Sequence, residues 1–294
     1  MRIGIACASG SAKGVFVHGV LAGLETRGFR AEMYAASSST SIPAAFAAIH
    51  DMDSLQDIEY WKRVRAEYVE AGSDASRAVK LGISAVLPTL GGRLFTDRAS
   101  RFAVAVSAVV TREAAALTQG EGARRLGQQL VISIRRRDRS WADANLSARL
   151  LDTRAADPAH RLTPANLADA LYATTRMLHA WKEPAWIDGE PYVDASYTSM
   201  CPARELVRLG MEEVVAISPE CGTVYTDFFQ SAEMPASLGG VRIHVIQPQV
   251  NLAEIGVDYL KATDDGSLTA FRLGQEAAVQ FLRAFPNGGT PPPR

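Results

Sequence analysis

The chain is poor in cysteine and contains no long apolar run. Its 294 residues include three cysteines, Cys7, Cys201 and Cys221, and none stands in a CxxC or Cys/His spacing. This excludes a disulfide framework and a zinc finger, so we expect small buried thiols in a reducing compartment. Hydrophobic residues make up 47% and charged residues 21%, which is typical of a globular chain.

Charge of either sign is not in excess, because the formal net charge is −1. A near-neutral chain has no whole-molecule attraction for nucleic acid or anionic lipid, so we expect no nucleic-acid partner. The charge run RRRDRS (135–140) is typical of a solvated loop.

No apolar stretch reaches the roughly 18 residues that a spanning helix needs. MRIGIACASGSAKG also lacks the regions of a signal peptide, which predicts a cytoplasmic protein.

Short apolar runs alternate with helical patterns, and this order predicts parallel strand pairing in an α/β sheet. A helix should follow the first strand and stop before Gly28, and a hairpin should turn at Asp188-Gly189. We expect strands at 2–8, 31–36, 129–134, 213–218 and 241–248. Further helices are expected at 42–49, 166–178, 202–210 and 269–283, and the pattern of residues 51–127, including ASRFAVAVSAVV (99–110), is mostly helical. Without repeats or a long linker, the sequence predicts a single domain over 1–285 and a flexible tail, PNGGTPPPR, over 286–294.

Glycine is scarce in the loops that carry candidate chemistry. ASGSAKG (8–14) lies between the first strand and the first helix, where unpaired backbone N–H groups attract a phosphate or a developing oxyanion. The dinucleotide fingerprint and the P-loop are both absent, because only Gly10 and Gly14 stand in this loop. A phosphate site, an oxyanion hole and a plain tight turn all remain open from this loop alone.

The stretch YAASSSTSIPAAF (34–46) contains no glycine, although four serines and a threonine occupy its turn. A strand-to-helix turn can hold a reactive serine in a strained conformation, as in the G-x-S-x-G elbow. Here A-S-S-S-T puts Ala36 and Thr40 in the two glycine positions. The alternative is a serine-rich helix N-cap.

A carboxylate, rather than a histidine, is the better candidate base. Asp194 follows the β-compatible PYV in WIDGEPYVDASYTSMCP and precedes small polar residues, so it could accept a serine proton directly. None of the five histidines stands in a motif; they are His18, His50, His160, His179 and His244. A serine enzyme of this sequence would therefore use a Ser–Asp dyad rather than a triad.

Taken together, these stretches resemble the patatin-like phospholipases. ASGSAKGVFVHGVLAGLETRGF resembles the opening of that family, and AEMYAASSSTSIPAAF resembles its nucleophile elbow. ADALYATTRMLHAWKEPAWIDGEPYVDASYTSMCPARELVRLGMEEVVAIS resembles the segment with the catalytic aspartate, and LGQEAA resembles a closing helix. The resemblance covers nearly the whole chain, in order.

The resemblance implies a patatin-like three-layer fold, with a central mostly parallel sheet flanked by helices. Its best register puts the nucleophile at Ser38 and the base at Asp194, while a shift to Ser39 breaks neighbouring matches. Lys13 stands in place of the usual arginine. The implied oxyanion and substrate-binding loop comprises Gly10, Ser11, Ala12, Lys13 and Gly14.

The sequence departs from the family pattern where glycine is usual. The first loop keeps one glycine before Ala-Lys, the elbow has none, and the D-G-[GA] motif is Asp194-Ala195-Ser196. Backbone donors survive a change from glycine to serine if the dihedral angles allow it. If a donor requires a positive φ, Ser11 costs roughly 1 kcal/mol or more.

The leading hypothesis is a serine acyl hydrolase that cleaves lipid or other acyl esters, with 51–127 as a helical insertion forming an acyl pocket or lid. The resemblance implies a phospholipid or lysophospholipid substrate and transient contact with a membrane surface. We expect neither a cofactor nor a metal. An acyltransferase or thioesterase acting on a carrier-bound substrate is the first alternative, and a non-catalytic patatin-like binding protein is the second. The sequence leaves the oligomeric state open.

Overall fold

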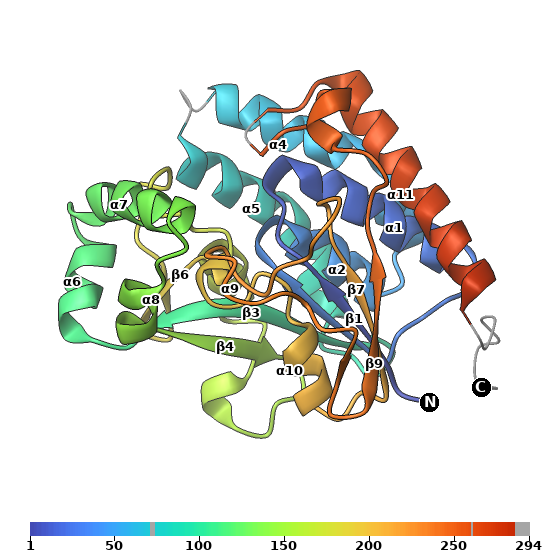
Figure 1. The fold of residues 1–294 in the computed structure, drawn as a ribbon, viewed down its shortest axis with the longest axis horizontal. Helices are drawn as coiled ribbons and strands as arrows, with labels where there is room; N and C mark the ends of the chain where they lie inside the picture. The colour runs from blue at the N-terminus through green and yellow to red at the C-terminus, as the bar shows by residue number, and fades with distance from the viewer. Residues whose placement is uncertain (71–73, 260, 286–294) are drawn as a thin grey trace.

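The computed structural model describes residues 1–70, 74–259 and 261–285, so the flexible tail expected at 286–294 lies outside the described residues. Within these ranges, one nine-stranded mixed sheet is flanked by helices (Figure 1). Figure 1 shows α1 and α11 on one side of the sheet and α10 on the other. The predicted α/β class, with a mostly parallel central sheet, is confirmed.

The sheet has a parallel centre and antiparallel ends. In space the strands run β5-β6-β3-β2-β1-β7-β9-β8, and β4 also pairs with β3. Neighbours from β3 to β9 are parallel, whereas β4, β5, β6 and β8 make antiparallel pairs. The strands are β1 (Ile3–Cys7), β2 (Met33–Ser37), β3 (Arg101–Val109), β4 (Leu146–Asp152), β5 (Trp186–Ile187), β6 (Glu190–Val193), β7 (Glu213–Ile217), β8 (Ser237–Leu238) and β9 (Val241–Ile246).

Helices connect most of these strands, and short 3₁₀ turns begin several of the connections. The α-helices are α1 (Gly14–Thr26), α2 (Ser41–Ala48), α3 (Met52–Gln56), α4 (Glu59–Glu70), α5 (Ala75–Arg93), α6 (Arg112–Gln119), α7 (Ala123–Arg135), α8 (Ser140–Asn145), α9 (Leu167–Ala173), α10 (Ala203–Arg208) and α11 (Asp264–Ala284). The 3₁₀ turns are η1 (Ser11–Lys13), η2 (Ser38–Thr40), η3 (Pro158–His160), η4 (Ala195–Tyr197) and η5 (Leu252–Ile255).

Both faces of the central sheet are buried, because successive side chains of a strand point to opposite faces. Ile5 and Cys7 of β1 belong to the large cluster beneath α1, α2, α5, α9 and α11. Ala6 belongs to a smaller cluster that includes α10. A third cluster lies among α6, α7 and α8. Strands buried on both faces read as continuous apolar runs.

The strand β3 brings the ends of two distant strands together. Ser37, the last residue of β2, pairs with Ala105, and Val193, the last residue of β6, pairs with Ser107. Because β4 pairs along residues 103–109 on one edge, β2 and β6 share the other edge and meet there end to end. The residues that follow β2 and β6 are therefore neighbours.

Two predicted elements are wrong. QLVISI (129–134) is the second half of α7, where Ala123, Leu126 and Leu130 form one buried stripe at helical spacing. ASRFAVAVSAVV (99–110) contains β3 rather than a helix, so the helical insertion expected over 51–127 has a central strand inside it. In that strand, residues 102–109 are buried, and burial of both faces removes the polar–apolar alternation that marks a half-exposed strand.

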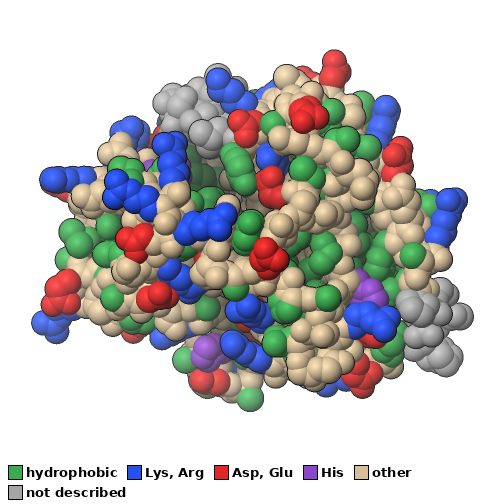
Figure 2. Space-filling view, viewed as in Figure 1, with side chains coloured by type: hydrophobic (Ala, Val, Ile, Leu, Met, Phe, Trp, Pro, Cys, Tyr) green, Lys and Arg blue, Asp and Glu red, His purple; other side chains and the backbone are tan. Residues whose placement is uncertain are grey.

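Other expected elements are confirmed. The largest boundary differences are at α9, which ends at Ala173 rather than at 178, and at α11, which begins at Asp264 rather than at 269. Gly28 follows α1 with φ of 71°, and Asp188 and Gly189 have positive φ in the β5–β6 turn. Figure 2 shows Lys and Arg side chains gathered over the end of the molecule where α6, α7 and α8 lie, and Arg136 and Arg137 are exposed there, as expected of a solvated run. Among the described helices, none combines the length and apolar composition needed to cross a membrane.

Candidate active site

Ser38 occupies the sharp turn between β2 and α2. Its φ is 59°, a left-handed conformation that few residues other than glycine adopt. Its side chain is 7% exposed and faces a cavity. The strand-to-helix turn predicted from the sequence is therefore present, with Ser38 in its strained position.

Asp194 lies directly opposite, at the end of β6. The Ser38 hydroxyl donates a hydrogen bond to Asp194 Oδ2 at 3.0 Å, and the Ser196 N–H donates to Asp194 Oδ1 at 2.8 Å. Asp194 has no exposed surface, and this burial raises the pKa of its carboxyl to about 6. The carboxylate can therefore accept a proton from a group beside it at neutral pH.

Ser39, the alternative nucleophile position, points elsewhere. Its hydroxyl donates to the Ser11 carbonyl oxygen at 2.9 Å, so it ties the elbow to the first loop. Ser37 is fully buried, and its hydroxyl donates to the Ser199 carbonyl oxygen at 2.8 Å. Of these three consecutive serines, Ser38 is the one whose hydroxyl contacts a carboxylate.

Thr174 holds the backbone of Ser38, a role that the sequence pattern did not indicate. The Ser38 N–H donates to Thr174 Oγ1 at 2.8 Å, and that hydroxyl donates to the Ala105 carbonyl oxygen at 2.6 Å. Thr174 is fully buried just after α9. The two consecutive threonines in YATTRM could have suggested such a role, but the sequence does not indicate which backbone groups their hydroxyls contact.

The loop before α1 presents unpaired amides beside the elbow. Ser11 has φ of 48°, so the strain foreseen for a serine in this loop is present. The N–H groups of Ala12 and Lys13 donate to the carbonyl oxygens of Tyr259 and Gly10, and the Gly14 N–H caps η1. The amides of Gly10 and Ser11 donate to no group within the described ranges, and Ser11 lines the same cavity as Ser38.

Lys13 does not reach the cavity. Its ammonium group lies 3.0 Å from the Glu220 carboxylate and 4.5 Å from the centre of the Tyr259 ring. The side chain is almost fully buried. It therefore links the first loop to two later segments, and it is absent from the cavity lining.

A cavity of about 190 Å³ opens beside Ser38. Its walls come from the first loop, the elbow, α4, α5 and the segment after α9, with Trp61, Val79 and Trp181 among them. Ile83 and Val86 of α5 lie in the main core, and Leu81 is exposed. The site thus combines a serine–carboxylate pair with a small and largely apolar chamber.

The histidines lie away from the serine–carboxylate pair. His18 Nδ1 accepts from Trp61 Nε1 at 2.9 Å, and burial lowers its pKa to about 4. None of the five histidines hydrogen-bonds to Ser38 or Asp194. Among the residues that the structure describes, no cluster of three or more His, Cys, Asp or Glu side chains is suited to a metal ion.

Comparisons with known proteins do not assign this chain to a family. Neither a scan against models of protein families nor a search of curated proteins finds a match to this chain. Any functional conclusion therefore rests on the contacts of Ser38 and Asp194 and on the cavity beside them.

Proposed function

We propose that the protein is a patatin-like serine acyl hydrolase with Ser38 as nucleophile and Asp194 as base. The observation that carries this proposal is the hydrogen bond from the Ser38 hydroxyl to Asp194 Oδ2 at 3.0 Å. A serine is a weak nucleophile until an adjacent base accepts its proton. The left-handed turn at Ser38 and the adjoining cavity give that hydroxyl access to a substrate.

In the first half of the reaction, Ser38 Oγ attacks the carbonyl carbon of an ester or thioester while its proton moves to Asp194. The tetrahedral intermediate carries a negative oxygen, and the unpaired amides at Gly10 and Ser11 are the candidate donors in the first loop. The intermediate collapses to an acyl-serine, and Asp194 gives the proton to the leaving alcohol or thiol. Because Asp194 has an elevated pKa, it suits both proton transfers.

In the second half, water takes the position of the leaving group. Asp194 accepts a proton from that water, whose oxygen attacks the acyl carbon. Collapse of the second intermediate releases the carboxylic acid and returns the proton to Ser38 Oγ. No histidine is required, because the carboxylate contacts the nucleophile directly.

The cavity supports a short acyl group as substrate. Its volume is about 190 Å³. For comparison, an apolar protein cavity of about 150 Å³ holds one benzene molecule, so this chamber suits an acyl chain of about six to eight carbons. Short-chain esters or thioesters therefore fit it better than the long-chain phospholipids that the family resemblance implied.

The test is intact-mass analysis after treatment with a fluorophosphonate probe. We expect the wild type to gain one probe and Ser38→Ala to gain none. Ser39→Ala is the matched control and should still be labelled, because its hydroxyl contacts a backbone oxygen rather than Asp194. An unlabelled, folded wild type would refute the proposal, and loss of label only in Ser39→Ala would move the nucleophile by one residue.

A further inference from the structure

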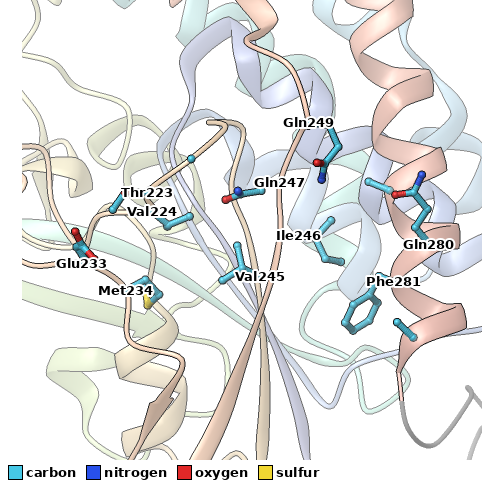
Figure 3. Close-up of a pocket in the computed structure, with 13 residues that line it drawn as sticks. Thr223, Val224, Glu233, Met234, Val245, Ile246, Gln247, Gln249, Gln280 and Phe281 are labelled. Carbon is cyan, nitrogen blue, oxygen red and sulfur yellow. The ribbon is translucent and has the colours of Figure 1, made fainter.

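A second cavity lies between β9, α11 and the loop before β8, and it shares no lining residue with the Ser38 chamber. Its volume is about 580 Å³, within the range of about 300–1,000 Å³ typical of ligand sites. Figure 3 shows its walls: Val245 and Gln247 from β9 and the residues after it, Glu233 and Met234 from a preceding loop, and Phe281 from α11.

This cavity adjoins an open edge of the sheet. β8 covers only the start of β9, where Leu238 pairs with Val241. The Ile243 N–H also donates a hydrogen bond, to the Ala236 carbonyl oxygen. On the other edge, the Ile246 carbonyl oxygen accepts from the Ser218 N–H in the direction of β7. Because backbone groups alternate in direction along a strand, the N–H and C=O of Val245 point away from β7. Neither has a hydrogen-bond partner among the described residues.

The segment that could have covered this edge turns away and pairs with itself. The Met234 N–H donates to the Val224 carbonyl oxygen at 2.7 Å, and Tyr225 bridges Glu233 in antiparallel fashion. Beyond Ile243 the loop therefore forms a wall opposite β9 instead of an added strand. The unpaired N–H and C=O of Val245 face the space between this loop and β9, beside the side chains of Gln247 and Gln249.

The charge of the cavity lining favours some bound peptide segments over others. Glu233 is the one charged side chain in its lining, as far as the described residues go. Glu233 is exposed and has no ion-pair partner within the described part of the chain. A lysine or arginine of a bound segment would complement this carboxylate.

We propose that this cavity binds an extended peptide segment of another protein, which adds to the sheet edge at Val245 and places a basic side chain against Glu233. Strand addition to an open edge supplies main-chain hydrogen bonds, while adjacent side-chain pockets supply specificity. The carboxylate makes a basic segment the favoured occupant over an acidic one. The binding is independent of the proposed hydrolase activity, because the two cavities are separate.

The test starts from a phage-displayed library of random heptapeptides selected on the full chain. We expect the enriched peptides to share a proline-free core that contains a lysine or arginine. Fluorescein-labelled copies are then titrated by fluorescence anisotropy. Val245→Pro should weaken binding roughly tenfold or more, because it removes the outward N–H and blocks the edge. Proline is tolerated on an edge strand when its missing N–H faces outward.

Val245→Thr is the matched control, because it keeps the N–H and should bind like the wild type. Glu233→Gln should reduce the preference for basic over acidic peptides. Peptides methylated on the core backbone nitrogens should bind more weakly to the wild type, which tests the same contact without altering the protein. Equal affinity of Val245→Pro and Val245→Thr, no enrichment from the library, or dimerisation of the chain through this edge would each overturn the proposal.

Discussion

Ser38 and Ser11 adopt a left-handed backbone conformation, which glycine adopts more readily than other residues. Their φ values are 59° and 48°. Such strain costs about 1–3 kcal/mol per residue and persists only where neighbouring contacts hold it. Here the Thr174 hydroxyl holds the Ser38 amide, and the Ser39 hydroxyl holds the Ser11 carbonyl oxygen. The two strained loops are thus fixed to each other and to β3.

Replacing Thr174 tests whether this support matters for the chemistry. Thr174→Val keeps the shape of the side chain but leaves the buried Ser38 N–H and Ala105 carbonyl oxygen without their shared partner. We expect the rate of fluorophosphonate labelling to fall roughly tenfold or more, because small misplacements of a reacting group are costly. The measurement is labelling rate at matched fractions of folded protein.

Thr174→Ser is the control for that substitution. It keeps the hydroxyl and loses only a methyl group, so labelling should recover toward the wild-type rate even though a small packing defect remains. If Thr174→Val labels as fast as the wild type, the hydroxyl has a structural role alone.

The ionisation of Asp194 sets a second expectation at this scale. Its pKa is raised by burial to about 6, and only the carboxylate form can accept the Ser38 proton. The labelling rate should therefore rise between about pH 5 and about pH 7 and then level off, since the base is already ionised. Asp194→Asn should remove the labelling at every pH. A rate that stays flat across this range would exclude Asp194 as the base.

At the residue scale, the sequence indicated Ser38 and Asp194 as a pair, but it did not indicate the Thr174 hydroxyl that holds the Ser38 backbone. Ser38 and Asp194 each follow a short strand, and such local order is visible in the pattern of residues. The contact between Thr174 and Ser38 spans 136 residues of sequence, and it depends on where α9 ends relative to β3. Lys13 was expected to contribute to the oxyanion and substrate-binding loop. Its ion pair with Glu220 spans 207 residues of sequence, so local sequence did not indicate it either.

Among the elements, α5 borders the proposed substrate chamber, because Ala75, Ala78 and Val79 line the Ser38 cavity. We expect kcat/KM for p-nitrophenyl esters to rise from acetate to hexanoate and to fall at laurate. Val79→Ala enlarges the chamber and should shift the preference toward longer esters, whereas Ala78→Leu should shift it toward acetate. One methylene in an apolar pocket changes specificity by about tenfold or more.

Leu81→Ala is the matched control on the same helix, because Leu81 is exposed and lies outside the cavity lining. It should leave the order of ester preference unchanged. Highest activity on laurate in the wild type would contradict the size limit while leaving the Ser38–Asp194 assignment intact.

The two misassigned elements, β3 and α7, show where periodicity fails. In β3, burial of residues 102–109 gives an alanine- and valine-rich run with no alternation, which a helical pattern fits equally well. In α7, LVISI suggested a strand, but Ile132 is exposed and the buried stripe starts earlier, at Ala123. In both cases tertiary burial, rather than local propensity, decides the element.

At the scale of the whole molecule, α1 and α11 join the two ends of the described chain through a very close contact. A Cβ atom on Gly19 would lie 2.0 Å from the Phe271 carbonyl oxygen. Gly19→Ala should therefore force the helices apart and lower the free energy of unfolding by about 1–3 kcal/mol. Urea denaturation followed by circular dichroism measures this change.

Gly91→Ala provides a contrasting control in α5, because a Cβ atom at that position would meet no neighbouring group within 4 Å. That substitution should raise the free energy of unfolding by about 0.5–1 kcal/mol, since alanine loses less backbone entropy in a helix. If both glycine substitutions have the same effect, the close helix contact is not a determinant of stability.

The meeting of β2 and β6 on one edge of β3 also governs the order in which reactivity can arise during folding. Ser38 and Asp194 are 156 residues apart in sequence, and each reaches the site when its own strand pairs with β3. An intermediate with β2 docked but β6 still free holds the serine without its proton acceptor. Under the proposed mechanism, the hydroxyl of such an intermediate is no more reactive than that of an ordinary serine until β6 pairs with β3.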